Sequence, residues 1–366
     1  MQVKKVFAIT AALVLAACSS GGVPETTPSP SASAAANAPV GWPVRTAEYV
    51  DLWLHGYAMV LNDTAKVPLF DRGYRDQIME RRRQLNVTTA LDANTQKLRD
   101  GMSGKPNLEG SGQFVIFSFE SWDEVLRVTR LFVQNEGSPQ TVNDQTTQQL
   151  FLALRSAFKT VADREWLRLF VQSLDDEQTK FYQSYWTAQQ ADRAAARQAI
   201  QTAWNNTYKA KFQGYLRHER LADGTFILSL PLGGEGRALF DAQQGNAIAT
   251  SFPGSSTNAM GAIYTFAHEM VGNAASRAIE DNLTPAQARE GLSAKLLPIG
   301  QVRAGAILLS RVAPELVQGY QRFYLQQVGS AVPSGDPAAA FVAAFSVPQA
   351  VADGIARQID LVLAGI

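Results

Sequence analysis

The stretch YTFAHEMVGNAASRAIED, residues 264–281, predicts a helix that carries a histidine and a glutamate side by side, His268 and Glu269. An ideal helix advances about 100° per residue, so position 272 lies about 40° from His268, on the same face. That position is Gly272, which has no side chain. Asn273 lies about 140° round the helix and reaches the face of His268 only across a one-residue bulge. The stretch thus presents one imidazole and one carboxylate, and His268 has no second side chain one turn later on the same face of the helix.

Three strand-like segments precede this helix. Residues 225–230, 237–240 and 246–252 read TFILSL, RALF and NAIATSF, and the glycine-rich loop PLGGEG separates the first two. The helix is expected to begin after an N-cap at Ser256 or Thr257. The strands lead into the helix through Pro253-Gly254-Ser255-Ser256, so the predicted order is strands, a glycine-containing loop and a helix that bears His-Glu.

In this order and in the His-Glu pair, residues 225–290 resemble a gluzincin-type zincin metallopeptidase. In such domains an edge strand binds the substrate backbone, while His-Glu-x-x-His on the next helix binds zinc and its glutamate polarises the metal-bound water. The resemblance implies zinc as the cofactor, held by His268, with Glu269 as the general base. Gly272 stands where the second histidine belongs. HEMVGN also resembles the His-Glu-x-x-Gly-His motif of dipeptidyl peptidases, with Asn273 in place of the last histidine.

The resemblance also implies where further site residues would come from. Gluzincins take a third zinc ligand from a later glutamate, which makes Glu280 and Asp281 candidates in this chain of three histidines. Zincins also use a Tyr or His to donate to the oxyanion of the intermediate. Tyr320 and Tyr324, one helical turn apart, and Arg303 are the candidates here. Core packing is the other interpretation of the two tyrosines.

A second interpretation of the pair involves no metal. His268 is then a hydrogen-bonded histidine in or near the core, and Glu269 caps a helix or pairs with an arginine such as Arg277. The protein is then a non-catalytic, helical binding protein that holds an extended peptide or envelope component in a cleft beside residues 225–252. The other two histidines, His55 and His218, are expected on helix surfaces.

The first residues predict where the chain is exported. Lys4 and Lys5 precede an apolar stretch that ends at Cys18, which is typical of a signal peptide and too short to span a membrane. Leu15-Ala16-Ala17-Cys18 resembles the bacterial lipobox, which implies cleavage after residue 17 and acylation of Cys18. Ser19 is the type of residue that sends Gram-negative lipoproteins to the outer membrane. An ordinary secretory signal is the alternative. If Cys18 is acylated, its buried acyl chains, at about 0.8 kcal/mol per methylene, anchor the protein to the bilayer.

The processed chain carries little net charge and no disulfide. Removal of residues 1–17 takes away two lysines and leaves 31 basic against 33 acidic residues, a net charge of −2, so nothing draws it to nucleic acid. Cys18 is the single cysteine, so no intramolecular disulfide forms and stability depends on a conventional core. Residues 19–40 are rich in Ser, Pro, Ala and Gly and predict a disordered tether.

Residues 41–366 predict one predominantly helical α+β domain with a small sheet. Helical spacing of apolar residues recurs from 42 to 61, 73 to 85, 91 to 102, 122 to 135, 146 to 220, 302 to 312 and 315 to 328, and again from 338 to 366. QFVIFSF, residues 113–119, predicts an additional strand. Arg81-Arg82-Arg83 predicts a solvated helix face, with contact to lipid headgroups as the alternative.

Overall fold

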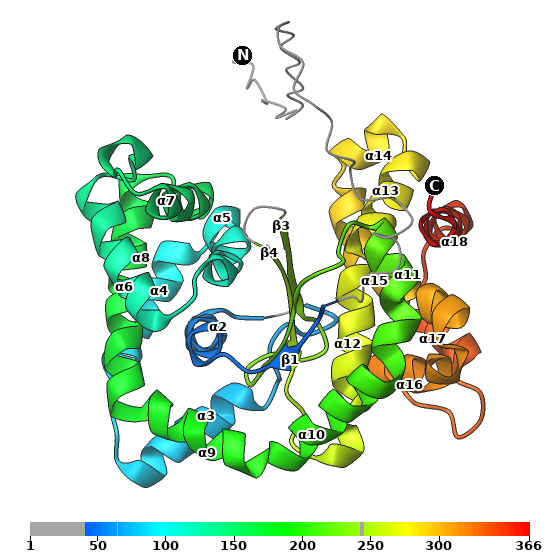
Figure 1. Ribbon diagram of the computed structural model, residues 1–366, viewed down its shortest axis with the longest axis horizontal. Helices are drawn as coiled ribbons and strands as arrows, with labels where there is room; N and C mark the ends of the chain where they lie inside the picture. Colours follow the sequence, from blue (N-terminus) through cyan, green and yellow to red (C-terminus); the bar gives the residue numbers. More distant parts are fainter. Residues whose placement is uncertain (1–40, 64, 242–244) are drawn as a thin grey trace, which may run out of the picture. The chain divides into compact units, whose positions relative to one another are not determined.

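The computed structural model describes residues 41–63, 65–241 and 245–366, which belong to one compact unit. The predicted signal peptide, the lipidated Cys18 and the tether of residues 19–40 lie outside the described residues. Most of the described chain is helical, and a small four-stranded mixed sheet lies among the helices (Figure 1). This confirms the mainly helical α+β class, although the structure does not show a zincin fold.

The sheet has the order β1-β2-β4-β3, so β1 and β3 form its two edges. Its strands are β1 (Val44–Arg45), β2 (Thr225–Ser229), β3 (Arg237–Asp241) and β4 (Gly245–Ser251). The predicted segments 225–230, 237–240 and 246–252 are thus confirmed as strands. β2 runs parallel to both β1 and β4, in the register Val44↔Phe226 and Phe226↔Ile248, whereas β3 pairs with β4 in antiparallel fashion.

The two faces of the sheet meet different surroundings because successive strand residues point to opposite sides. Phe226 packs against Phe266 and Trp204, with ring centroids 4.7 and 5.2 Å apart. Its neighbours Thr225 and Ile227 point the other way and border a cleft. One face is therefore closed by an aromatic cluster, and the other is partly open.

The first group of helices precedes the sheet strands β2–β4 in sequence and packs around α2 and α8. Its members are α2 (Glu48–Val60), α3 (Tyr74–Leu85), α4 (Ala90–Met102), α5 (Pro106–Glu109), α6 (Trp122–Gln134), α7 (Gln145–Ala157) and α8 (Val161–Glu177), with short 3-10 turns η1 (Ser111–Gln113), η2 (Val115–Ser118) and η3 (Pro139–Thr141). Thr89 and Thr160 begin α4 and α8 with capping boxes, which satisfy otherwise free N–H groups. In Figure 1 the helices α4–α8 lie on one side of the sheet.

A long, interrupted helical segment then leads to the other side of the sheet (Figure 1). It contains α9 (Gln183–Asp192), α10 (Ala194–Ala203) and α11 (Lys209–His218). The π-helical turn η4 (Gln178–Tyr182) joins α8 to α9, and a second one, η5 (Trp204–Tyr208), joins α10 to α11. Trp204, at the second π turn, donates from its indole to the carbonyl of Trp42, 2.7 Å away. This bond fixes the segment to the residues that enter β1.

The C-terminal helices form the second group. They are α12 (Met260–Met270), α13 (Gly272–Asn282), α14 (Pro285–Arg289), α15 (Leu292–Val312), α16 (Val317–Gln327), α17 (Ala338–Ala344) and α18 (Gln349–Ala364), with 3-10 turns η6 (Ser256–Asn258) and η7 (Pro314–Leu316). By length and composition α15 could cross a membrane, and so could α17 and α18 if the bent pair were counted as one span. α15 packs against α12, α13, α16 and α18.

Three local predictions are wrong. Residues 113–119 form 3-10 turns instead of a strand, because the carbonyls of Phe114 and Ile116 accept from the amides of Phe117 and Phe119 in the same segment. The helix expected over 264–281 is broken at Val271, whose φ of −96° and ψ of 5° separate α12 from α13. α12 begins after Ala259, because η6 occupies residues 256–258.

Candidate functional site

His268 and Glu269 occupy the last turn of α12 and are almost completely buried, with exposed fractions of 2% and 7%. The imidazole Nδ1 lies 2.8 Å from Glu269 Oε1. The same carboxylate oxygen accepts from the backbone N–H of Gly236 at 2.9 Å. His268 and Glu269 therefore bind each other and the glycine loop. Among the described residues no arginine forms an ion pair with Glu269, and Arg277 lies instead 3.8 Å from Glu219.

The glycine loop of residues 231–236 is built around this carboxylate. A Cβ at Gly236 would lie 2.7 Å from Glu269 Cγ, a distance that real Cβ atoms do not show, so only glycine allows the close approach. Further along the loop, Tyr324 donates from its hydroxyl to the carbonyl of Gly234 at 3.1 Å. The imidazole of His268 stacks on the Tyr324 ring, with centroids 5.4 Å apart. His268, Glu269 and Tyr324 together hold the loop in place.

The other predicted metal ligands lie apart and use their polar atoms elsewhere. Asn273 donates to Glu219 at 3.5 Å, Glu280 accepts from Ser276 at 3.0 Å, and Asp281 accepts from Gln358 at 3.4 Å. Among the described residues, no group of three or more His, Cys, Asp or Glu side chains could hold a metal ion. The break at Val271 explains this result, since residues after it no longer follow the face of α12 on which His268 lies.

The predicted oxyanion donors are located in the core. Tyr320 and Tyr324 are fully buried, and their hydroxyls donate to the carbonyls of Val302 (3.0 Å) and Gly234. Burial raises the pKa of both phenols well above the usual value. The guanidinium of Arg303 lies over the ring of Phe341, 6.0 Å from its centroid. All three side chains thus take the packing role that the sequence offered as the alternative for the tyrosines.

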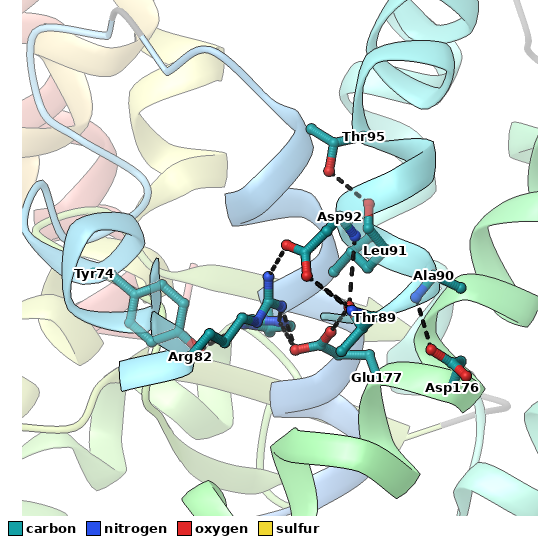
Figure 2. A network of polar contacts seen from close by, with 10 residues as sticks. Tyr74, Arg82, Thr89, Ala90, Leu91, Asp92, Thr95, Asp176 and Glu177 are labelled. Carbon is teal, nitrogen blue, oxygen red and sulfur yellow. Dashed lines mark hydrogen bonds and ion pairs between the residues drawn. The ribbon is translucent and has the colours of Figure 1, made fainter. Parts of the chain in front are cut away.

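A buried polar network that the sequence analysis missed lies in the first helical group (Figure 2). Arg82 forms ion pairs with Glu177 and Asp92, and Thr89 donates to the second oxygen of Glu177 at 2.5 Å. His55 Nε2 lies 3.2 Å from Glu177, while its Nδ1 lies 3.0 Å from the hydroxyl of Tyr74. The network joins α2, α3, α4 and the end of α8, directly before the π turn η4.

The protonation states of this network follow from burial and from the arginine. Burial alone would raise the pKa of Glu177, but the hydrogen bond from His55, the charge of Arg82 and the hydrogen bond from Thr89 outweigh it and lower the pKa to about 2. Burial lowers the pKa of His55, so we take its imidazole as neutral at pH 7 and Arg82 as the partner charge. Arg82 is 3% exposed and His55 is fully buried, so the predictions of a solvated Arg81–Arg83 face and a surface His55 are wrong for these two residues.

A second buried carboxylate, Asp51, connects α2 with the end of β2 and with α9. It accepts from the indole of Trp186 at 2.9 Å and from the backbone N–H of Leu230 at 3.2 Å. Burial, only partly offset by these hydrogen bonds and by the charge of Arg193, raises the pKa of Asp51 to about 7. Asp51 therefore titrates in the neutral range. It forms none of the salt bridges found among the described residues, so no ion pair lowers its pKa.

A cleft of about 1200 Å³ opens on the face of the sheet that α12 does not cover. Its walls come from the sheet, from the residues around η2 and from the first turns of α7. Apolar lining is supplied by Tyr49, Phe117, Leu150, Ile227 and Ala247, and polar lining by Arg45, Thr46, Glu120, Gln145, Thr146, Gln149, Asp223 and Asn246. A lining that combines apolar side chains with amide, hydroxyl and charged groups suits a ligand with apolar and hydrogen-bonding parts.

This cleft adjoins the strands that the sequence analysis singled out, at Thr225, Ile227 and residues 245–247, whereas the His268–Glu269 pair does not line it. No family model matches the chain, and neither a curated protein nor a solved structure was found to be significantly similar to it.

Proposed function

We propose that this chain is a non-catalytic binding protein of the bacterial envelope, anchored to the outer membrane through acylated Cys18. Its folded body would hold an extended peptide segment in the cleft bordered by β2, β4, η2 and α7. The observation that carries the proposal is this cleft of about 1200 Å³, with its mixed lining, beside strands whose sheet face is not covered by α12.

The lining supports a peptide because a peptide alternates apolar side chains with backbone donors and acceptors. Gln145, Gln149 and Asn246 carry amides that can both donate to and accept from a peptide backbone. Ile227 and Phe117 offer apolar surface for alternate side chains of the ligand. A cavity of this size exceeds what a single small metabolite fills, since small-molecule pockets measure about 300–1000 Å³.

Buried geometry argues against hydrolysis as the activity. A general base must reach the water that it activates, and Glu269 is 7% exposed and already accepts from Gly236 and contacts His268. The zincin-type peptidase, with Glu269 as base and zinc on His268, remains the alternative proposal. It requires His268, Asn273, Glu280 and Asp281 to rearrange around the ion.

A binding assay with an unfolded protein tests the proposal. The probe is fluorescein-labelled β-casein, titrated with the chain lacking residues 1–17 and followed by fluorescence anisotropy. Thr146→Trp places a bulky ring on an exposed position of the cleft wall. We expect this variant to weaken casein binding by about tenfold or more through steric exclusion. Thr187→Trp, on an exposed position of α9 that does not line the cleft, is the matched control.

Two outcomes would contradict the proposal: no casein binding by the unsubstituted chain, or equal binding by the two tryptophan variants. The peptidase alternative is measured in the same samples. It requires stoichiometric zinc by elemental analysis and casein cleavage that is lost in Glu269→Gln, and we expect neither.

A further inference from the structure

A second cavity, separate from the cleft, opens at the carboxyl ends of the parallel strands β2 and β4. It measures about 720 Å³ and is lined by the residues that follow each strand, including Gly233 after β2 and Pro253 after β4. The walls are completed by α3, α12 and α16. Ligands of open α/β sheets bind in the crevice outside the carboxyl ends of parallel strands, where the chain departs in different directions. The volume lies in the range of about 300–1000 Å³ typical of small-molecule sites.

Two arginines line this cavity without an ion-pair partner among the described residues. Arg193 donates to the carbonyl of Phe252 and to the amide oxygen of Gln189. Arg322 donates to the carbonyl of Pro333 at 2.6 Å and to that of Gly335. These acceptors are uncharged, so they fix the direction of both guanidinium groups without forming an ion pair. The charge of Asp51 acts on Arg193, but Asp51 does not line the cavity.

Acidic side chains of the lining do not neutralise the positive charge of the two arginines. Asp71 is the acidic residue of the lining, and its carboxylate accepts from the backbone N–H of Gly73 at 2.9 Å. The lining therefore carries a net charge of +1, from two arginines and one aspartate. Planar guanidinium groups match the geometry of carboxylate and phosphate oxygens, which makes an oxyanion the complementary ligand group.

The remaining lining is aromatic and amide-bearing. Tyr264 and Phe323 belong to α12 and α16, and both are partly exposed beside the arginines, with ring centroids 5.7 Å apart. The amides of Gln77 and Gln326 lie on the same lining and can donate to ligand oxygens. The cavity thus combines a cationic side with an aromatic side.

We propose that this cavity is a binding site for a small organic anion, with an oxyanion group held by Arg193 and Arg322 and an apolar ring body against Tyr264 and Phe323. It is independent of peptide binding in the cleft, because the two cavities share no lining residue. The oxyanion group is a carboxylate or a phosphate, since arginine binds both through charged hydrogen bonds.

The test uses 8-anilinonaphthalene-1-sulfonate, an aromatic anion whose fluorescence rises on binding, with the chain lacking residues 1–17. N-phenyl-1-naphthylamine, the same ring system without the sulfonate, is the neutral comparison. We expect saturable 1:1 binding of the sulfonate, about tenfold weaker in Arg322→Gln because a charged hydrogen bond is lost. Gln77→Glu adds a carboxylate at an exposed lining position and leaves both arginines in place. We expect this variant to lose a similar amount of sulfonate affinity. Because it leaves the loop contacts of Arg322 intact, such a loss would come from charge and not from a loosened loop.

Competition identifies the head group. Phenyl phosphate and benzoate are each expected to displace the sulfonate, whereas benzyl alcohol is not. The competitor of these two that binds more tightly shows whether the site prefers phosphate or carboxylate. Thr146→Trp in the cleft should leave the sulfonate affinity unchanged. The proposal is wrong if the neutral naphthylamine binds as tightly as the sulfonate, if benzyl alcohol competes equally, or if Gln77→Glu has no effect. Loss of sulfonate binding in Thr146→Trp would also contradict the proposal, because it would show that the dye binds in the cleft.

Discussion

Asp51 makes the stability of the fold depend on pH in a direction opposite to that of an ordinary paired carboxylate. Its pKa is about 7 in the folded state, whereas that of an exposed aspartate is 3.8. Below pH 3.8 it is neutral in both states and folding meets no ionisation penalty. As pH rises from 3.8 to 7, the unfolded chain ionises first, so stability falls across this window and then becomes constant.

The size of the loss follows from the shift. A difference of about three pKa units, at about 1.36 kcal/mol each, corresponds to about 4 kcal/mol for this fully buried group. Asp51→Asn removes the titration and keeps the shape. The amide oxygen accepts from only one of the two N–H donors, Trp186 or Leu230, and that loss does not vary with pH.

The assay is urea unfolding from pH 4 to pH 8, with the free energy of unfolding of Asp51→Asn subtracted from that of the unsubstituted chain. We expect this difference to fall by about 4 kcal/mol over the range, most of it before pH 7. Asp76→Asn, which removes an exposed carboxylate from α3, should give a nearly constant difference. A constant difference for Asp51→Asn as well would refute the reasoning.

Three further predictions concern the buried network and the glycine loop. Arg82→Met leaves Glu177 buried without its ion-pair partner and should reduce the free energy of unfolding by about 3–5 kcal/mol in urea titrations; a loss below about 1 kcal/mol would contradict the pairing. Gly236→Ala drives a methyl group into the carbonyl oxygen of Ala249 and into Glu269, and should cost about 1–3 kcal/mol in the same titrations; an unchanged free energy of unfolding would contradict this close approach. At Gly272→His the added Cβ has room, because the nearest atom, in Gln301, lies 3.7 Å away, yet elemental analysis should find no stoichiometric zinc.

The fold could be predicted where one local signal dominates. Residues 225–230 are rich in apolar and β-branched residues between turn signals, and the structure has a strand there. The capping sequence Thr284-Pro285-Ala286-Gln287 is such a signal, and α14 begins there with both reciprocal bonds formed. Residues 113–119 have equally strong strand propensity, but within the described part of the chain they pair with no strand and form 3-10 turns instead.

The site was harder to predict because its residues meet only in three dimensions. Glu177 lies 95 residues from Arg82 in sequence, and neither position differs from a surface residue in local pattern. Asp51 did leave a signal, since it is a lone acid inside the apolar stripe of α2, where all residues from Val50 to Val60 are buried. A charged residue on the apolar face of a helix indicates a buried polar partner.

The junction between Trp42 and the rest of the fold also determines how the protein responds to mechanical load. The Trp42 indole donates to Leu221, its carbonyl accepts from Trp204, and Gly41 exchanges backbone bonds with residues 222 and 224. A pull along β1 from Gly41 stretches these bonds and the parallel ladder to β2 together, because the force runs along the strand axis. Tension on the N-terminal end is thus shared by the sheet before any single contact yields.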